Sequence, residues 1–150
     1  MTDPAAFSPV ELLTFRVADQ EYALPINSVR EIRGWARPTP LPGAPHSIKG
    51  VINLRGVVLP VMGLADRLGT PAPAHNDRDV IIVVSHDDTL MGLLVDAVSD
   101  IVVVGDSGLQ PPPDGFFGGC VVSALALIED RMIRLLDLGE TLALPNGRAA

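Results

Sequence analysis

The sequence predicts a mainly all-β fold, in which two small closed barrels are related by an internal duplication and carry only short helices. Three observations lead to this prediction. Short segments rich in β-branched residues alternate with turns that contain Gly or Pro. No segment has the extended 3.6-residue periodicity of a long helix. The second half of the chain also repeats the first, and each copy has only the four or five short strands that suit a small barrel.

The first two strands are predicted from alternation. Apolar side chains occupy every second position from Leu13 to Val17 and again from Tyr22 to Ile26, with Asp19-Gln20 between them. Alternation of this kind is typical of a strand with one buried face. We therefore expect a hairpin that turns at Asp19-Gln20.

A short helix is predicted next. Asn27 is a good helix cap, and Val29 and Ile32 would share one face of a helix over Ser28–Ile32. The four prolines of Pro38–Pro45 then indicate a stiff extended connector, because proline fixes φ and has no backbone donor.

The central hairpin is the most informative stretch of the chain. Two β-branched runs, Ile48–Ile52 and Val57–Val61, enclose Asn53-Leu54-Arg55-Gly56. Asn first and Gly fourth suit a type I turn with Leu54 and Arg55 at its centre. A permanently charged guanidinium with five donors would then lie at the hairpin tip. In an isolated hairpin the simpler interpretation is a solubilising turn residue.

Two further short helices complete the expected elements. Met62–Leu68 reads as one or two helical turns stopped by Gly69, followed by a loop over Pro71–Asn76. Near the end of the chain, Asp137 is a candidate cap with Glu140 three residues later, which predicts a helix over Asp137–Leu144.

The internal repeat has two parts. Residues 13–32 align with 82–101 at an offset of 69, and residues 50–64 align with 124–138 at an offset of 74. The copies differ at the hairpin tip, where Leu127-Ile128-Glu129-Asp130 replaces the basic sequence of the first copy. This difference suggests that the two lobes meet different surfaces, and the seam between them is a natural binding groove.

We expect a single domain over 12–144, made of two lobes at about 12–74 and 78–144. Residues 1–9 and 145–150 are small or polar and are expected to be flexible termini.

Composition excludes several function classes. Eleven basic and eighteen acidic side chains give a net charge of -7, which argues against nucleic acid and anionic lipid as direct partners. A single cysteine and no recognisable signal peptide fit a reducing, cytoplasmic location. The longest apolar stretches are well short of the roughly 20 residues that span a bilayer.

Residue patterns of catalysis are also missing. Cys120 lies in the apolar sequence GGCVVS, which favours an inert buried thiol. His46, His75 and His86 are widely separated and lack metal-ligand spacing. With no phosphate-binding loop and no nucleophile motif, we expect no enzyme activity, cofactor or metal.

Several segments resemble the CheW family of bacterial chemosensory adaptors and the related regulatory domain of the kinase CheA. The matching sequences, in the family's order, are FRVADQEYALPINSVREIRG (15–34), IKGVINLRGVVLPV (48–61), VIIVVSHDDTLMGLLVDAVSDIV (80–102), LQPPP (109–113) and LIEDRMIRLLDL (127–138). The NLRG hairpin and the VDAVSDIV segment are the most specific. The resemblance implies two SH3-like five-stranded barrels, in agreement with the repeat.

The resemblance also implies a function. Members of the family couple transmembrane chemoreceptors to a histidine kinase by binding both, without catalysis. The expected partners are the regulatory domain of a CheA-type kinase and the cytoplasmic tip of chemoreceptors, which would recruit a cytoplasmic protein to membrane-associated arrays. Two alternatives stay open: a CheW-like scaffold in a non-flagellar chemosensory pathway, and a small-molecule sensor that uses the groove between the lobes.

Candidate partner-binding residues are transferred from the family only where this sequence matches it. They are Val29, Glu31, Gly50, Asn53, Arg55 and Gly56. Val29 suits core packing equally well, and Gly50 suits a tight backbone approach. Glu31 and Arg55 would be structural if they pair with each other. The sequence departs from the family at Gly63, where an acidic residue is common, and over Phe116–Val122.

Overall fold

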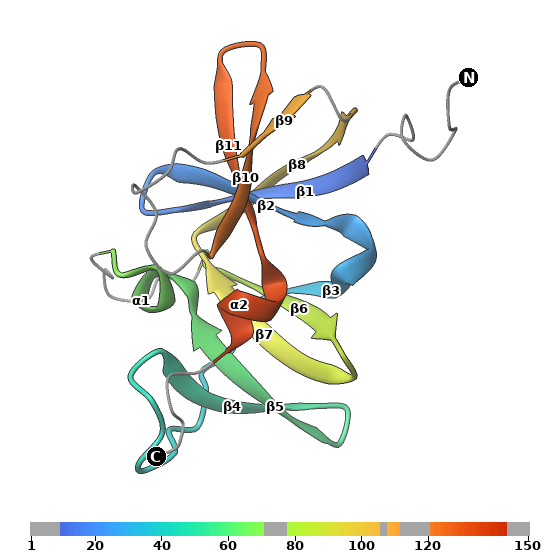
Figure 1. Ribbon diagram of the computed structural model, residues 1–150. Coiled ribbons are helices and arrows are strands. Elements are labelled where there is room, and N and C mark those ends of the chain that lie inside the picture. Colours follow the sequence, from blue (N-terminus) through green and yellow to red (C-terminus); the bar gives the residue numbers. More distant parts are fainter. Residues whose placement is uncertain (1–9, 71–77, 106–107, 112–120, 144–150) are drawn as a thin grey trace.

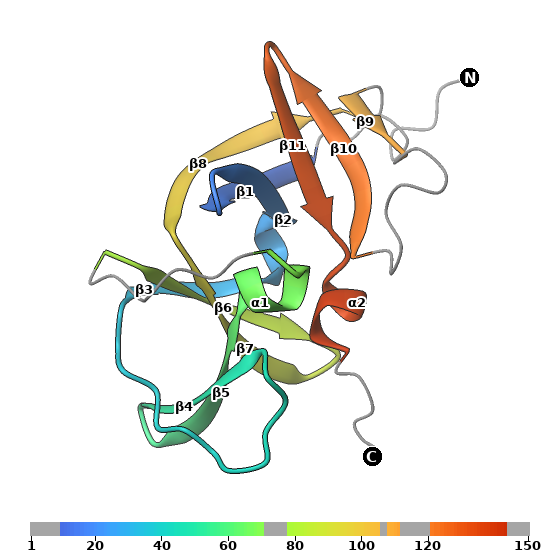
Figure 2. The ribbon, with the colours of Figure 1, turned by 90° about the vertical axis from the view of Figure 1, so that its left-hand side faces the viewer.

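The computed structural model describes residues 10–70, 78–105, 108–111 and 121–143. Figures 1 and 2 show a molecule built almost entirely of strands, with short helices near its middle. The elements are β1 (Val10–Val17), β2 (Gln20–Pro25), the 3-10 turn Ile26–Ser28, β3 (Val29–Gly34), β4 (Ile48–Leu54), β5 (Val57–Gly63), α1 (Leu64–Leu68), β6 (Val80–His86), β7 (Thr89–Val95), β8 (Ala97–Val104), β9 (Leu109–Gln110), β10 (Val122–Ile128), β11 (Arg131–Leu136) and α2 (Leu138–Leu142).

The strands form two sheets, which we name the six-stranded lobe and the five-stranded lobe. The six-stranded lobe has the order β8-β1-β2-β11-β10-β9, and the five-stranded lobe has the order β3-β6-β7-β5-β4. Adjacent strands are antiparallel except for the pairs β2–β11 and β5–β7, which are parallel. The predicted mainly-β fold with two SH3-like lobes and short helices is confirmed.

The two sequence repeats exchange strands between the lobes. At the offsets found in the sequence, β1 to β5 correspond to β6, β7, β8, β10 and β11, and this substitution converts the order of the five-stranded sheet into the β8-β1-β2-β11-β10 part of the other. Each lobe therefore takes a hairpin from one repeat and three matching strands from the other, and the six-stranded lobe adds β9. The expected lobe boundaries of 12–74 and 78–144 separate the repeats and not the sheets. The β1–β2 hairpin pairs on its two sides with β8 and β11 from the other repeat. These pairings stabilise it, because a hairpin alone is only marginally stable in water.

One apolar core lies between the lobes and a smaller one lies inside each. The central core draws side chains from both sheets, among them Phe15, Leu24, Met62 and Leu93, all fully buried. The five-stranded lobe has its own cluster around Leu59, and the six-stranded lobe has one around Ile133. The seam that we expected to form a groove is thus packed with apolar side chains in its interior.

The predicted helix over Ser28–Ile32 is wrong. The only helical turn at this place is Ile26–Ser28, after which Val29–Gly34 forms β3 and pairs with β6. Apolar residues three apart fit a helix, but Val29 and Ile32 are β-branched, and a bulge in β3 changes the alternation of its faces. Pairing with a strand some 50 residues away, through five registered positions, overrides the weak local preference for a helix.

The predicted conformation of the central turn is also wrong. Leu54 pairs with Val57, so Asn53 and Leu54 belong to β4 and the turn consists of Arg55 and Gly56 alone. Both turn residues have positive φ, 50° and 88°. A two-residue turn of this type follows the twist of its strands, whereas a type I turn would splay them.

The other predicted helices are confirmed in outline. Gly69, with φ of 77°, ends α1 at its C-terminus, and the Asp137 side chain accepts a hydrogen bond from the Glu140 backbone N–H at the start of α2. The predictions for Pro71–Asn76, for Cys120 and for the flexible termini lie outside the described residues.

Candidate partner-binding site

The tip of the β4–β5 hairpin is held in shape by its own residues. The Asn53 side-chain oxygen Oδ1 accepts a hydrogen bond of 2.7 Å from the Gly56 backbone N–H. Gly56 has the positive φ that this turn position requires, at no steric cost for glycine. Asn53 and Gly56 thus hold the turn that presents Arg55 at the tip.

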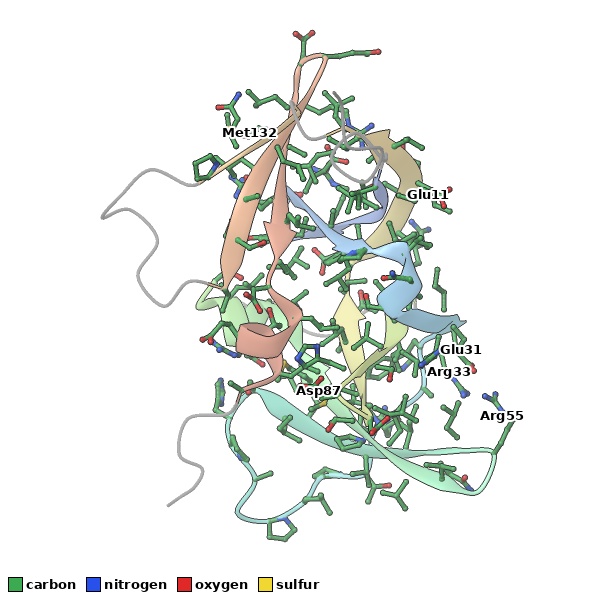
Figure 3. The ribbon with its side chains drawn as sticks, turned by 45° about the vertical axis from the view of Figure 1, so that its right-hand side comes forward. Glu11, Glu31, Arg33, Arg55, Asp87 and Met132 are labelled. Carbon is green, nitrogen blue, oxygen red and sulfur yellow. The ribbon has the colours of Figure 1, made fainter. Side chains whose placement is uncertain are left out.

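Arg55 forms an ion pair with Glu31 of β3. Its Nη2 donates to Glu31 Oε1 at 2.6 Å, and Nη1 is 3.5 Å from Oε2. The Arg55 side chain is 72% exposed and that of Glu31 is 29% exposed. Figure 3 shows both side chains, with Arg33 beside them, in the space between β3 and the hairpin tip. The pair thus connects the two outer strands of the five-stranded lobe while leaving most of the guanidinium in solvent.

The electrostatics of this pair are those of a carboxylate among cations. The hydrogen bond from Arg55 lowers the pKa of Glu31, and the charges of Arg55 and Arg33 act in the same direction. The hydrogen bond with Glu31 raises the pKa of Arg55 in turn. Arg55 is bonded to the Glu31 carboxylate and Arg33 adds a second positive charge nearby, so these three side chains together carry a net positive charge.

Exposed apolar side chains lie near this charge. Val57 follows the turn directly, and Val58, opposite Asn53 in the hairpin, is 70% exposed. Ile32, next to Glu31 in β3, is also exposed. An exposed cation with apolar neighbours is the usual composition of a protein-binding surface.

Two of the predicted site residues lie elsewhere. Val29 packs against the central core and pairs with Val84. Gly50 is buried with φ of 144°, and a Cβ added there would lie 2.2 Å from the Thr39 carbonyl oxygen. The structure thus brings Glu31, Asn53, Arg55 and Gly56 together, while Val29 and Gly50 shape the lobe behind them.

A second ion-pair site lies in the six-stranded lobe and was not predicted. Arg131 donates to Glu21 through Nε at 3.0 Å and Nη2 at 2.6 Å, and Nη2 also lies 3.1 Å from Asp100 Oδ1. The buried Thr14 hydroxyl donates to the same Asp100 carboxylate. Asp100 occupies the repeat position of Glu31, which was the one available sequence signal for this site.

The second site is more enclosed than the first. The Arg131 side chain is 32% exposed and that of Glu21 is 14% exposed. Hydrogen bonds from Arg131 lower the pKa of both Glu21 and Asp100. Three strands of the six-stranded lobe, β2, β8 and β11, are thereby joined by one guanidinium.

One surface hollow has room for a small molecule. It has a volume of about 300 Å³ and is lined by Val10, Glu11, Pro25, Ile26 and Asn27. It lies beside the start of β1 and contains none of the six candidate site residues. Among the described residues, no group of three or more His, Cys, Asp or Glu side chains is placed to bind a metal ion.

Comparison with known proteins identifies the family. The model of the CheW-like domain matches residues 11–145, which is most of the chain. This chain belongs to the CheW family. The chemotaxis protein CheW of Rhizobium meliloti is 49% identical over 130 residues, covering 85% of this chain and 84% of that protein. The Bacillus subtilis CheW is 33% identical over 142 residues, covering 93% of this chain and 91% of its own.

A solved structure agrees with the fold. The crystal structure of the scaffolding protein TtCheW from Thermoanaerobacter tengcongensis superimposes with a TM-score of 0.86 at 30% identity, covering 95% of this chain and 97% of that one. Membership of the CheW family makes this protein a chemotaxis adaptor or scaffold. No helix within the described parts of the chain is long and apolar enough to span a membrane.

Proposed function

We propose that this protein is a non-catalytic adaptor that couples transmembrane chemoreceptors to a CheA-type histidine kinase. The observation that carries the proposal is Arg55: a guanidinium fixed at a two-residue turn, mostly exposed, beside the exposed Val57 and Val58. The backbone that presents this side chain is already ordered, so binding a partner does not require ordering the turn.

The contact surface consists of Glu31, Asn53, Arg55 and Gly56, and Val29 and Gly50 support it from within the lobe. A carboxylate of the partner competes with Glu31 for the Arg55 guanidinium, and apolar partner groups cover Val57 and Val58. The kinase regulatory domain and the cytoplasmic receptor tip are the two partners. The protein works in the cytoplasm and reaches membrane-associated receptor arrays only through them.

Reversing the charge at Arg55 tests this proposal. Arg55→Glu places a carboxylate beside Glu31 and removes the donor that the partner needs, so we expect at least about a tenfold loss of affinity for one or both partners. Arg16→Glu makes the same charge change at another exposed arginine, whose described hydrogen bond goes to the Asp19 carbonyl, and should bind as the wild type does. The measurement is a titration of each variant with purified kinase regulatory domain and with a soluble receptor fragment. Wild-type affinity of Arg55→Glu for both partners would refute the assignment.

A further inference from the structure

Helix α2 follows β11 of the six-stranded lobe but lies against parts of the five-stranded lobe. Figure 2 shows it beside α1, which follows β5, in the space between the two sheets. A Cβ added at Gly139 of α2 would lie 3.0 Å from Nε2 of His86, the last residue of β6. On their other side, Leu138 and Leu142 pack against the central core. Helix α2 therefore crosses the seam between the lobes and covers the core there.

The C-terminal end of α2 is bonded by an arginine of α1. Arg67 Nε donates to the Thr141 carbonyl oxygen at 2.9 Å, and Nη2 donates to the Glu140 carbonyl oxygen at 2.6 Å and lies 3.4 Å from that of Ala143. The last carbonyl groups of a helix have no partner within the helix, and a cation is favourable beside them. The five residues of α2 themselves include no basic side chain. Arg67 thus supplies the cap that α2 lacks.

Comparison of the repeats shows why α2 depends on this contact. At the offset of 74, Gly69 at the end of α1 corresponds to Ala143 at the end of α2. Gly69 takes the left-handed conformation and its N–H donates to the Asp66 carbonyl oxygen, so local residues close α1. Ala143 has φ of -71° and does not make this turn. The second copy of the helix therefore ends on a guanidinium that belongs to the first copy.

Helix α2 is also too short to be stable alone. It has five residues, whereas isolated helices shorter than about 12 residues are marginal in water. It is held by the Asp137 cap at its start, by Leu138 and Leu142 on the core, and by Arg67 at its end. The strands around it are joined by long registered pairings, so α2 is the element that needs the fewest contacts broken to detach.

We propose that α2 is a latch across the seam, which Arg67 holds closed and which opens as a local unit while both sheets stay folded. Opening withdraws Leu138 and Leu142 from the central core and exposes an apolar cleft between the lobes. The binding groove that the repeat led us to expect at the seam is then present only in the open form. The proposal does not rest on the adaptor function.

Amide hydrogen exchange of the purified full chain, followed by NMR at increasing low concentrations of urea, tests whether the latch opens locally. The Thr141 and Ala143 N–H groups donate to the Asp137 and Gly139 carbonyl oxygens. We expect both to have similar protection, at least about tenfold lower than that of the slowest amides of β6 and β7 and independent of urea. Exchange of both only through global unfolding would overturn the proposal. Low protection of Ala143 alone would overturn it too, since that is fraying of the last residue.

A variant then tests the role of the guanidinium. Arg67→Gln removes the donors at the end of α2, so the protection of Thr141 should fall at least about tenfold further while that of β6 and β7 is unchanged. Fluorescence of the apolar dye anilinonaphthalene sulfonate should rise, because the open form exposes the core at the seam.

The matched control is Arg16→Gln. Arg16 also donates to a backbone carbonyl oxygen, that of Asp19, but within a single hairpin. This variant should leave the protection of Thr141 and the dye fluorescence as in the wild type. Unchanged protection of Thr141 in Arg67→Gln, or an equal loss in Arg16→Gln, would contradict the assignment of Arg67. The exchange pattern of the wild type tests the latch even if Arg67→Gln does not fold.

Discussion

The two lobes bind equivalent carboxylates with arginines from different repeat positions. Glu31 and Asp100 match at the offset of 69, whereas the repeat position of Arg55 is Glu129 and that of Arg131 is Val57. In the five-stranded lobe, Arg55 meets one carboxylate and remains mostly in solvent; in the six-stranded lobe, Arg131 meets two and is largely enclosed. Both connect the third strand of a repeat to a hairpin. The two repeats thus keep a carboxylate at the same place in their third strand, but its arginine is largely enclosed in the six-stranded lobe and mostly exposed in the five-stranded lobe.

The largest difference in unfolding free energy between matched positions of the β4–β5 and β10–β11 hairpins is expected at Gly50. Its repeat position in β10 is Ala124, and both strands have a bulge there. Only Gly50 has a carbonyl oxygen where a Cβ would be, so Gly50→Ala should lower the free energy of unfolding by about 3 kcal/mol or more. Ala124→Gly should cost at most about 1 kcal/mol. Urea unfolding of the two variants measures both values, and equal losses would contradict the close approach of Thr39.

The next effect should come from the enclosed ion pair. Arg131→Ala leaves the carboxylate of Glu21 without its partner in a poorly solvated place, and we expect a loss of about 1–2 kcal/mol in unfolding free energy, reduced by the solvent exposure of Asp100. Arg55→Ala should leave the unfolding midpoint nearly unchanged, because the Arg55–Glu31 pair lies at the surface. If Arg55→Ala lost more stability than Arg131→Ala, the structural role would belong to Arg55 and not to Arg131.

A smaller effect is expected in the response to acid. The pKa values of Glu21 and Asp100 are lower in the folded protein than their ordinary values of 4.5 and 3.8, chiefly because of hydrogen bonds from Arg131. Their contribution to stability is therefore complete above these values and is lost as the pH falls through the folded pKa values. Between about pH 6 and about pH 3, Arg131→Gln should lose less stability than the wild type does. Arg55→Gln should change this slope less, since it affects only Glu31. Equal slopes in the wild type and Arg131→Gln would contradict the assignment.

Local sequence was sufficient to predict the features that depend on neighbouring residues. The hairpin, its exposed arginine, the Asp137 cap and the repeat all follow from patterns within a few residues or from comparison of one half with the other. The helix expected at Ser28–Ile32 failed because β3 is determined by its pairing with β6. The exchange of strands between repeats has no local signal at all.

The enclosed ion pair was missed for the same reason. Arg131 and Glu21 are 110 positions apart and meet only because β11 lies parallel to β2. Of the six candidate site residues, four meet at the hairpin tip, and two have internal positions that only the packing of the lobe could reveal.

The central claim is that Arg55 serves a partner and not only Glu31. A charge exchange, Arg55→Glu with Glu31→Arg, tests it directly, because it preserves the internal ion pair and removes the cation from the tip. We expect the exchanged protein to fold normally. In a titration with the kinase regulatory domain or the receptor fragment, it should nevertheless bind at least about tenfold more weakly than the wild type. Full recovery of binding on exchange would show instead that the pair acts only by holding β3 to the hairpin.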